Sequence, residues 1–301
     1  MPHFADRLAA LVEERRSRLV LGLDPDPAAL WPVAIGRGAA DGATAARAAR
    51  AVERHCLAAI EAAAPSCVAA KLQFACFERL GAQGWLALEV VRDAARGSGL
   101  LVIADAKRGD VPVTSKAYAQ ALVGSTPTPF GVVEGFEADA FTASPLLGLD
   151  SLEPLIEGAA RAGAGCFLLV STSNPGAPDL QDLEAGGAPL HERIAQLVHE
   201  AGGEHVGECG LSLVGAVVGA TRPERLARLR SLMPQAIFLL PGVGAQGGGT
   251  GALGPAFEPH PAAGLVAASR SIVDAYRERG GDPATAAAAV AQELRSATWN
   301  Q

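Results

Sequence analysis

Short apolar segments alternate along the chain with longer segments of helical periodicity. The apolar segments are rich in Val, Leu, Ile and Ala and show little alternation with polar residues. This pattern is typical of parallel strands that are buried on both faces. The predicted strands are Leu19–Leu23, Val68–Leu72, Leu100–Ala104, Ala138–Thr142, Cys166–Ser171, Gly215–Gly219, Ala236–Leu240 and Gly264–Ala268.

Amphipathic segments separate these strands and predict helices. They are Ala45–Ala63, Trp85–Arg96, Leu149–Ala162, Leu190–Ala201 and Pro223–Leu232. Strand–helix alternation predicts parallel pairing with right-handed crossovers. An open doubly wound sheet also fits this alternation, but the count of about eight strands favours a closed (β/α)8 TIM barrel. We therefore expect one α/β barrel domain over the 301 residues.

Three segments lie outside this alternation. Met1–Glu14 predicts a short N-terminal amphipathic helix. Asp24–Gly42 and Gly247–Pro261 are rich in Gly and Pro and predict long loops, the second of them between the seventh and eighth strands. In barrel enzymes the loops that follow strands carry function, and those after the last two strands often hold phosphate.

Composition narrows the classes of function. The net charge of −7 argues against non-specific nucleic-acid binding, and the apolar runs are too short to predict a membrane span. The five cysteines are odd in number and form no CxxC pair. With no signal peptide evident, this indicates reduced thiols and a cytoplasmic protein. Because no His, Cys or carboxylate group has metal-ligand spacing, we predict no metal.

Charge is concentrated where the first three predicted strands end. The third strand runs directly into Asp105 and Lys107, which are two residues apart and should project to the same face. Lys71 ends the second strand and Asp24 the first, whereas Asp110 lies beyond the third strand on a loop. A structural ion-pair network could explain any one of these charges. Together, at the catalytic end of a barrel, they favour an active site.

A second candidate site lies at the other side of the predicted barrel mouth. The glycine-rich segment 241–247 (PGVGAQG) follows the seventh strand, and Arg270 follows the eighth, where it is expected to open the final helix. Free backbone amides, a helix N-terminus and a guanidinium together favour a phosphate site. Ser173, in the sequence Ser-Asn-Pro-Gly, is by its residues alone a turn position.

Several blocks of the sequence resemble one known family. Residues 105–110 (DAKRGD) resemble the D-x-K-x-x-D signature of the orotidine 5'-phosphate decarboxylases, and the longer string to Thr114 (DAKRGDVPVT) is similar to the bacterial subgroup called type 2. Further similar blocks occur in the family's order. They are Lys71–Glu78 (KLQFACFE), Thr142–Gly148 (TASPLLG), Thr172–Gly176 (TSNPG), Val218–Thr221 (VGAT) and Pro241–Gly247 (PGVGAQG).

The resemblance implies a cofactor-independent enzyme of pyrimidine synthesis, which converts orotidine 5'-monophosphate to uridine 5'-monophosphate and CO2. By match to the motif, Lys107 would lie beside C6 of the pyrimidine and donate a proton to it. Asp105 would lie against the substrate carboxylate, and Lys71 would hold Asp105 and a ribose hydroxyl.

The resemblance also implies the binding residues. Asp24 would bind the ribose, Ser173 the pyrimidine edge, and Gln246 and Arg270 the phosphate. Asp110 and Thr114 match positions that the family contributes to the partner's site. A homodimer with composite sites is therefore expected.

Three other functions share some of these features. A magnesium-dependent phosphosugar decarboxylase of the same superfamily would share D-x-K-x-x-D, but it would carry an acidic residue where Lys71 stands. A Schiff-base aldolase could use a buried lysine as nucleophile, but Lys107 beside Asp105 should stay protonated. A non-catalytic nucleotide-binding barrel would not need the intact charge cluster.

Overall fold

The computed structural model describes residues 2–36, 42–243 and 249–301. Eight strands close into a barrel in which every neighbouring pair is parallel. This confirms the predicted (β/α)8 TIM barrel. Around the barrel the strands are β1 (Leu19–Leu23), β10 (Gly264–Ala268), β9 (Phe238–Pro241), β8 (Val214–Val218), β7 (Gly165–Ser171), β6 (Ala140–Ala143), β3 (Leu101–Arg108) and β2 (Ala69–Gln73).

Each predicted strand corresponds to one barrel strand, with ends that shift by a few residues. β3 is the main exception, because it continues past the predicted end at Ala104 to Arg108. All residues of β1, β8 and β10 are buried. Burial on both faces explains why these strands read as continuous apolar runs.

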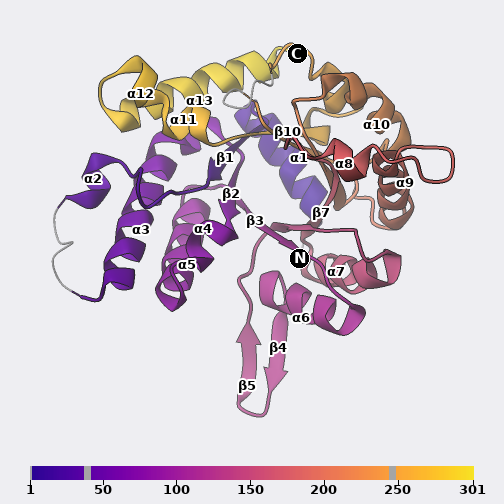
Figure 1. The fold of residues 1–301 in the computed structure, drawn as a ribbon, viewed down its shortest axis with the longest axis horizontal. Helices are drawn as coiled ribbons and strands as arrows, with labels where there is room; N and C mark the ends of the chain where they lie inside the picture. Colours follow the sequence, from indigo (N-terminus) through magenta and orange to yellow (C-terminus); the bar gives the residue numbers. More distant parts are fainter. Residues whose placement is uncertain (1, 37–41, 244–248) are drawn as a thin grey trace.

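Helices surround the barrel (Figure 1). The predicted amphipathic segments all form helices, and α2 lies within the segment expected to be a long loop. The helices are α1 (Phe4–Arg15), α2 (Pro32–Ile35), α3 (Thr44–Ala63), α4 (Phe74–Glu78), α5 (Ala82–Gly97), α6 (Pro112–Leu122), α7 (Leu149–Ala162), α8 (Pro178–Gln181), α9 (Leu190–Gly202), α10 (Leu226–Leu232), α11 (Arg270–Val273), α12 (Ala275–Arg279) and α13 (Pro283–Trp299). Short 3-10 turns are η1 (Ala64–Ser66), η2 (Pro223–Arg225), η3 (Gly254–Phe257) and η4 (Pro261–Ala263). Among the described residues, no helix combines the length and apolarity needed to cross a bilayer.

Helix α1 lies across the amino end of the barrel. Phe4 packs edge-to-face on Phe167 of β7, with ring centroids 5.9 Å apart. Arg7 Nη1 lies 2.5 Å from Asp139 Oδ1, just before β6, and Arg15 donates to the carbonyl of Cys67, just before β2. These contacts close the amino end, so the carboxyl ends of the strands are the open face.

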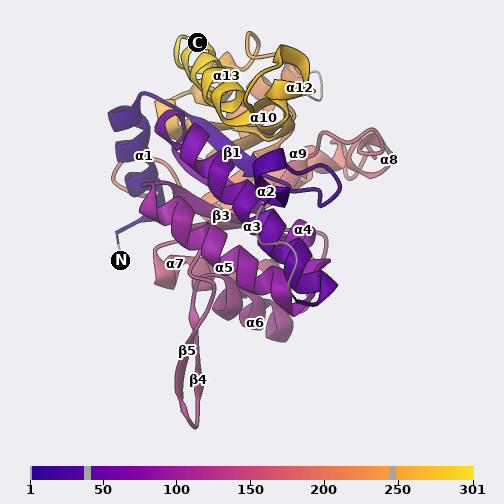
Figure 2. The same cartoon turned by 90° about the vertical axis from the view of Figure 1, so that its left-hand side faces the viewer.

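A β-hairpin projects from the barrel between α6 and β6 (Figures 1 and 2). It consists of β4 (Ser125–Thr128) and β5 (Gly131–Glu134), which pair antiparallel. All residues of β5 are exposed, and Phe130 at the tip is 99% exposed. The hairpin was not predicted, because its two short strands face no core and therefore carry no periodic apolar signal.

Candidate active site

The carboxyl ends of β1, β2 and β3 bring together four of the predicted site residues. Lys71 Nζ lies 2.6 Å from Asp105 Oδ2 and 3.3 Å from Asp24 Oδ1. Lys107 Nζ lies 2.6 Å from Asp105 Oδ1. The charges therefore alternate in sign along one connected set, Asp24–Lys71–Asp105–Lys107, which we call the charge set.

The end of β3 is irregular, and this irregularity places Lys107. The residue has a φ of 47°, in the left-handed region, which costs a side-chain-bearing residue about 1–2 kcal/mol. The pairing of β3 with β6 also shifts register between Ala104 and Arg108. Lys107 and Asp105 thus meet as predicted, but through a distorted strand end and not through regular alternation.

Thr142 of β6 supports this geometry. Its hydroxyl donates to Asp105 Oδ1 at 2.9 Å and accepts from the Lys107 backbone N–H at 3.0 Å. One side chain therefore fixes both the carboxylate and the left-handed residue. Thr142 begins the block 142–148 that resembles the family, but its residue type and position alone indicated no role.

Burial and pairing determine the charge states. Burial alone would raise the pKa of Asp105, but the ammonium groups of Lys71 and Lys107 outweigh it and hold that pKa below its ordinary value. Burial alone would lower the pKa of Lys71, but Asp105 and Asp24 outweigh it and raise that pKa. Asp105 and Lys71 are therefore both ionised at neutral pH.

Lys107 differs from Lys71 in its exposure. The Lys107 side chain is 43% exposed, whereas that of Lys71 is 8% exposed. Apart from Asp105, the side chain that Lys107 Nζ reaches is Gln73, whose Oε1 lies 3.4 Å away. An ammonium group held at one side and open at the other can meet a ligand in the barrel mouth.

A cavity of about 480 Å³ lies against the charge set. Its wall includes the predicted pyrimidine-binding residue Ser173. The lining residues are Lys71, Asp105, Lys107, Thr142, Leu169, Thr172, Ser173, Asn174, Gln181, Val217, Leu239 and Pro241. A lining that combines apolar side chains with a few charges suits a flat polar ring with one reactive edge.

A smaller cavity of about 120 Å³ adjoins the first, because Lys71 and Pro241 line both. Arg270 and Ser271 line its far side. Arg270 is exposed and forms no ion pair with a carboxylate of the described residues. The buried Oγ of Ser271, a residue that no sequence motif indicated, has no hydrogen-bond partner among the described residues. Both groups can donate hydrogen bonds to an anion.

Of the two predicted phosphate-binding residues, the prediction for Arg270 needs a correction, and Gln246 cannot be compared with the structure. Arg270 does not open the final helix: it opens α11, a helix of 4 residues, and the final helix is α13. The chain turns again at Asp274 before α13 can begin. Gln246 lies outside the described residues, as does most of the glycine-rich segment around it.

Asp110 and Thr114 do not join the charge set within one chain. Asp110 Oδ1 accepts from the backbone N–H of Val111 at 2.7 Å, and its carbonyl accepts from Ser115 Oγ at 2.8 Å. These bonds hold Asp110 at the start of α6. No hydrogen bond or ion pair links either residue to the four charges in the described chain.

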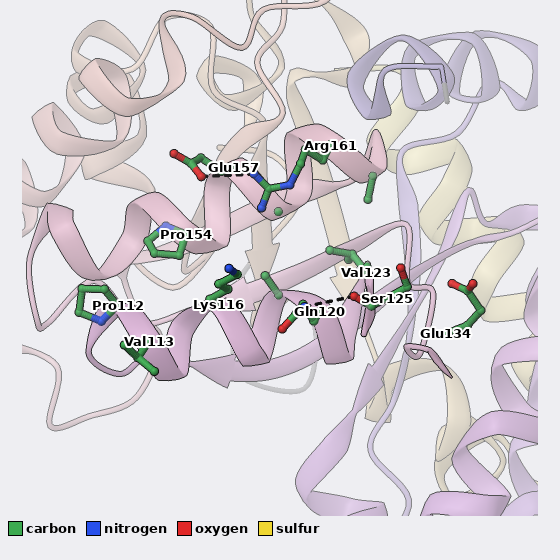
Figure 3. A pocket seen from close by; sticks show the side chains of 14 residues that line it. Pro112, Val113, Lys116, Gln120, Val123, Ser125, Glu134, Pro154, Glu157 and Arg161 are labelled. Carbon is green, nitrogen blue, oxygen red and sulfur yellow. Dashed lines mark hydrogen bonds and ion pairs between the residues drawn. The ribbon is translucent and has the colours of Figure 1, made fainter. Parts of the chain in front are cut away.

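A larger cavity, of about 800 Å³, lies elsewhere, in a groove between α6 and α7 beside the hairpin (Figure 3). It contains none of the predicted site residues. Its ion pair joins Glu157 to Arg161 at 3.3 Å across one exposed helix face, and Lys116 points across it (Figure 3). Size alone does not make a reaction site, so we assign the candidate active site to the charge set. Among the described residues, no His, Cys, Asp or Glu group of three or more could hold a metal ion.

Most of the chain is similar to members of one known family. The model of the family described as "Orotidine 5'-phosphate decarboxylase / HUMPS family" matches residues 17–290. Orotidine 5'-phosphate decarboxylase of Rhodopirellula baltica is 40% identical over 280 residues, covering 92% of this chain and 90% of that protein. The enzyme of the same name from Deinococcus radiodurans is 39% identical over 297 residues, covering 98% of both chains.

A solved structure extends the likeness to three dimensions. The structure of Leishmania donovani OMP decarboxylase superposes with a TM-score of 0.72 at 32% identity, covering 99% of both chains. The match includes the barrel and the segments that carry the charge set. The chain therefore belongs to the orotidine 5'-phosphate decarboxylase / HUMPS family.

Proposed function

We propose that this protein is an orotidine 5'-phosphate decarboxylase, which converts orotidine 5'-monophosphate to uridine 5'-monophosphate and CO2. The observation that carries the proposal is the charge set, in which Lys107 is held by Asp105 at 2.6 Å and still faces a cavity. The full-length relatives with this activity in their names support the choice within the family.

The chemistry needs a fixed cation. When the bond from C6 to the carboxylate breaks, CO2 leaves and the electron pair stays at C6. The ammonium of Lys107 stabilises this pair and then donates a proton to C6. Lysine is left neutral and regains its proton from solvent. One unit charge about 4 Å away contributes about 4 kcal/mol at an effective dielectric of 20, and a preorganised site needs little reorganisation to supply it.

The remaining polar residues hold the substrate around this point. Asp105 lies against the substrate carboxylate, Lys71 holds Asp105 and a ribose hydroxyl, and Asp24 binds the ribose. Ser173 meets the pyrimidine edge. The contacts among Asp24, Lys71 and Asp105 support this arrangement, since they orient the three side chains before any ligand binds.

The phosphate group binds at the small cavity. Arg270 is its main partner, with Gln246 from the segment after β9. Among the described residues, the guanidinium of Arg270 forms no ion pair with a carboxylate and the Oγ of Ser271 has no hydrogen-bond partner, and both residues line the cavity, which supports this assignment. We add Ser271 as a hydrogen-bond donor to the phosphate.

A homodimer completes each site, with Asp110 and Thr114 reaching into the partner's cavity. Exposed apolar side chains at the start of α6, next to Asp110 in the chain, and around the start of the adjacent helix α7 support this, because exposed apolar surface can mark an interaction site. The side chains, with their exposures, are Val111 (52%), Val113 (84%), Leu146 (70%), Leu147 (46%) and Leu149 (41%).

Subunit mixing tests the composite site. Homodimers of Lys107→Ala and of Asp110→Ala should both be nearly inactive. Mixed dimers hold one doubly defective site and one intact site. Statistical exchange should therefore restore about a quarter of wild-type activity, as two-fold symmetry requires. No recovery after verified exchange would show that Asp110 serves its own subunit.

The activity itself is tested by following orotidine 5'-monophosphate spectrophotometrically with a chelator present. Full turnover without metal is expected. Turnover that stops with the chelator and returns with Mg²⁺ would favour the magnesium-dependent relatives. Borohydride trapping of Lys107 with a sugar phosphate would favour an aldolase. Tight nucleotide binding without turnover would leave a binding protein.

We further propose that the enzyme needs no cofactor and acts in the cytoplasm. The five cysteines are free in the structure, which supports this location because disulfides are rare in that reducing compartment.

A further inference from the structure

We infer that Gln181 is a positioning residue, which holds the turn 172–174 in place so that Ser173 can meet the pyrimidine. The inference rests on the proposed function, since it concerns the base end of the same cavity. Gln181 comes from α8, the short helix after β7, and lines the cavity together with the turn. No feature of the sequence singled it out.

The side-chain amide of Gln181 forms two hydrogen bonds with Thr172. Its Oε1 accepts from the backbone N–H of Thr172 at 2.9 Å, and its Nε2 donates to Thr172 Oγ1 at 2.7 Å. The Thr172 hydroxyl in turn donates to Asn174 Oδ1 at 2.7 Å. The two bonds use both ends of the amide, so a side chain of the same length without the amide could not replace it.

Helix α8, which carries Gln181, is held in place by contacts with α9 and η2. The Gln181 carbonyl lies 2.8 Å from His191 Nδ1 of α9, and a carbonyl can only accept, so that nitrogen carries the proton. The next residue, Asp182, pairs with Arg225 Nη2 at 2.8 Å. A helix of one turn has little stability alone, and these contacts fix it to the following β/α unit.

The turn is also confined from the opposite side. Gly219, after β8, approaches so closely that an added Cβ would lie 3.0 Å from the backbone nitrogen of Ser173 and 3.1 Å from its Cβ. Its own N–H donates to the Ser171 carbonyl at 2.6 Å. Ser173 thus lies between Gly219, a close backbone neighbour, and Thr172, which Gln181 holds, so its backbone has little room to shift.

The test compares Gln181→Leu with Gln196→Leu. Gln196 lies on α9, bonds to Arg193 on the same helix at 3.0 Å and lines neither cavity, so its loss should leave catalysis unchanged. Gln181→Leu should lower kcat/KM for orotidine 5'-monophosphate by about ten- to a hundredfold, the loss expected when hydrogen-bonded groups are left unpaired. The melting temperature should stay near that of the wild type.

Ligand binding separates positioning from general damage. Uridine 5'-monophosphate has the base, whereas ribose 5-phosphate lacks it. Gln181→Leu should weaken the first by about tenfold and leave the second within about twofold of the wild type. Equal losses for both ligands would overturn the inference, as would wild-type affinity for uridine 5'-monophosphate.

A second variant keeps the test decisive if Gln181→Leu does not fold. Thr172→Val removes the hydroxyl to which Gln181 donates. This variant too should weaken the binding of uridine 5'-monophosphate more than the binding of ribose 5-phosphate. When both variants fold, the double variant should lose less than the product of the single losses, because the two residues act through one contact. A loss in the double variant equal to the product of the two single losses would overturn the inference. A wild-type protein that fails to decarboxylate orotidine 5'-monophosphate would instead overturn the proposed function itself.

Discussion

The barrel buries charge at both of its ends, and the two ends satisfy it differently. At the amino end, Arg230 is 8% exposed and its guanidinium carbon lies 3.8 Å from the ring centroid of Phe238. It donates to neutral backbone carbonyls within 2.9 Å, namely those of Met233, Ala236, Ala256 and Ala263. At the carboxyl end, ammonium and carboxylate groups alternate in the charge set instead.

The comparison of the two ends shows when a charged side chain in the barrel indicates a reaction site. Burial lowers the pKa of Arg230 to about 10, so the group stays charged at neutral pH. Its Nη1 and Nη2 groups donate to carbonyls in and beside η3 and η4 and in the segment after α10. Lys107 keeps an open face toward a cavity. Buried charge at the amino end joins segments together, whereas at the carboxyl end it leaves binding capacity for a ligand.

The largest expected effect is at Lys107. The change Lys107→Ala should lower the decarboxylation rate by at least about a thousandfold, since about 4 kcal/mol of electrostatic stabilisation is lost. Circular dichroism should stay near that of the wild type, because the side chain is half-exposed and leaves the barrel core intact. A rate above a tenth of the wild type would remove Lys107 from the mechanism.

Arg230→Leu should have the opposite profile. Several buried carbonyls lose their partner, so the free energy of unfolding should fall by about 3–5 kcal/mol, while kcat of the folded fraction stays close to the wild type. Urea unfolding and active-site titration measure the two quantities. The control is Arg228→Leu on the same helix, whose ion pair with Glu192 lies at the surface, and its melting temperature should hardly change. Equal effects of the two variants would contradict the structural role of Arg230.

The pH dependence of stability provides a third test, at Asp105. Asp105→Asn breaks a buried pair and should lower the free energy of unfolding at pH 7 by about 3 kcal/mol. Because the folded-state pKa of Asp105 is depressed, its stabilisation is complete above the ordinary value of about 3.9 and is lost as the pH falls below it. The difference in free energy of unfolding between wild type and variant, measured by urea titration, should therefore become smaller as the pH falls below about 4. A gap that stays constant would mean that the Asp105 carboxylate adds nothing to folding.

The smallest of these effects is expected at Arg270, an exposed charge at the mouth. Arg270→Ala should lower kcat/KM by about ten- to a hundredfold, as expected for a charge-assisted contact worth about 1.5–3 kcal/mol. With a substrate that lacks its phosphate, added phosphite dianion should raise the rate of the wild type more than that of the variant, because phosphite would bind at the cavity that Arg270 lines. An unchanged kcat/KM would place the phosphate site elsewhere.

Much of this molecule can be predicted from periodicity alone. The eight barrel strands were predictable because strands buried on both faces must be apolar throughout. The charges of Asp24, Lys71, Asp105 and Lys107 stood out because each interrupts or follows such a strand. The β4–β5 hairpin and the role of Arg230 could not be predicted in this way, since neither depends on a periodic apolar pattern.

The sequence by itself determined the parallel barrel and the end at which charge gathers, because both follow from local hydrophobicity and from the order of strands and helices. Only the tertiary structure decided how the charges meet. The left-handed turn at Lys107 depends on the Thr142 hydroxyl from the neighbouring strand, and the turn at Ser173 depends on Gln181 and Gly219. The contacts of Lys107 with Thr142 and of Ser173 with Gly219 join neighbouring strands and the loops after them, so they exist only once the barrel has formed. The Gln181 bonds to Thr172 span only nine residues, but no periodic pattern indicates them.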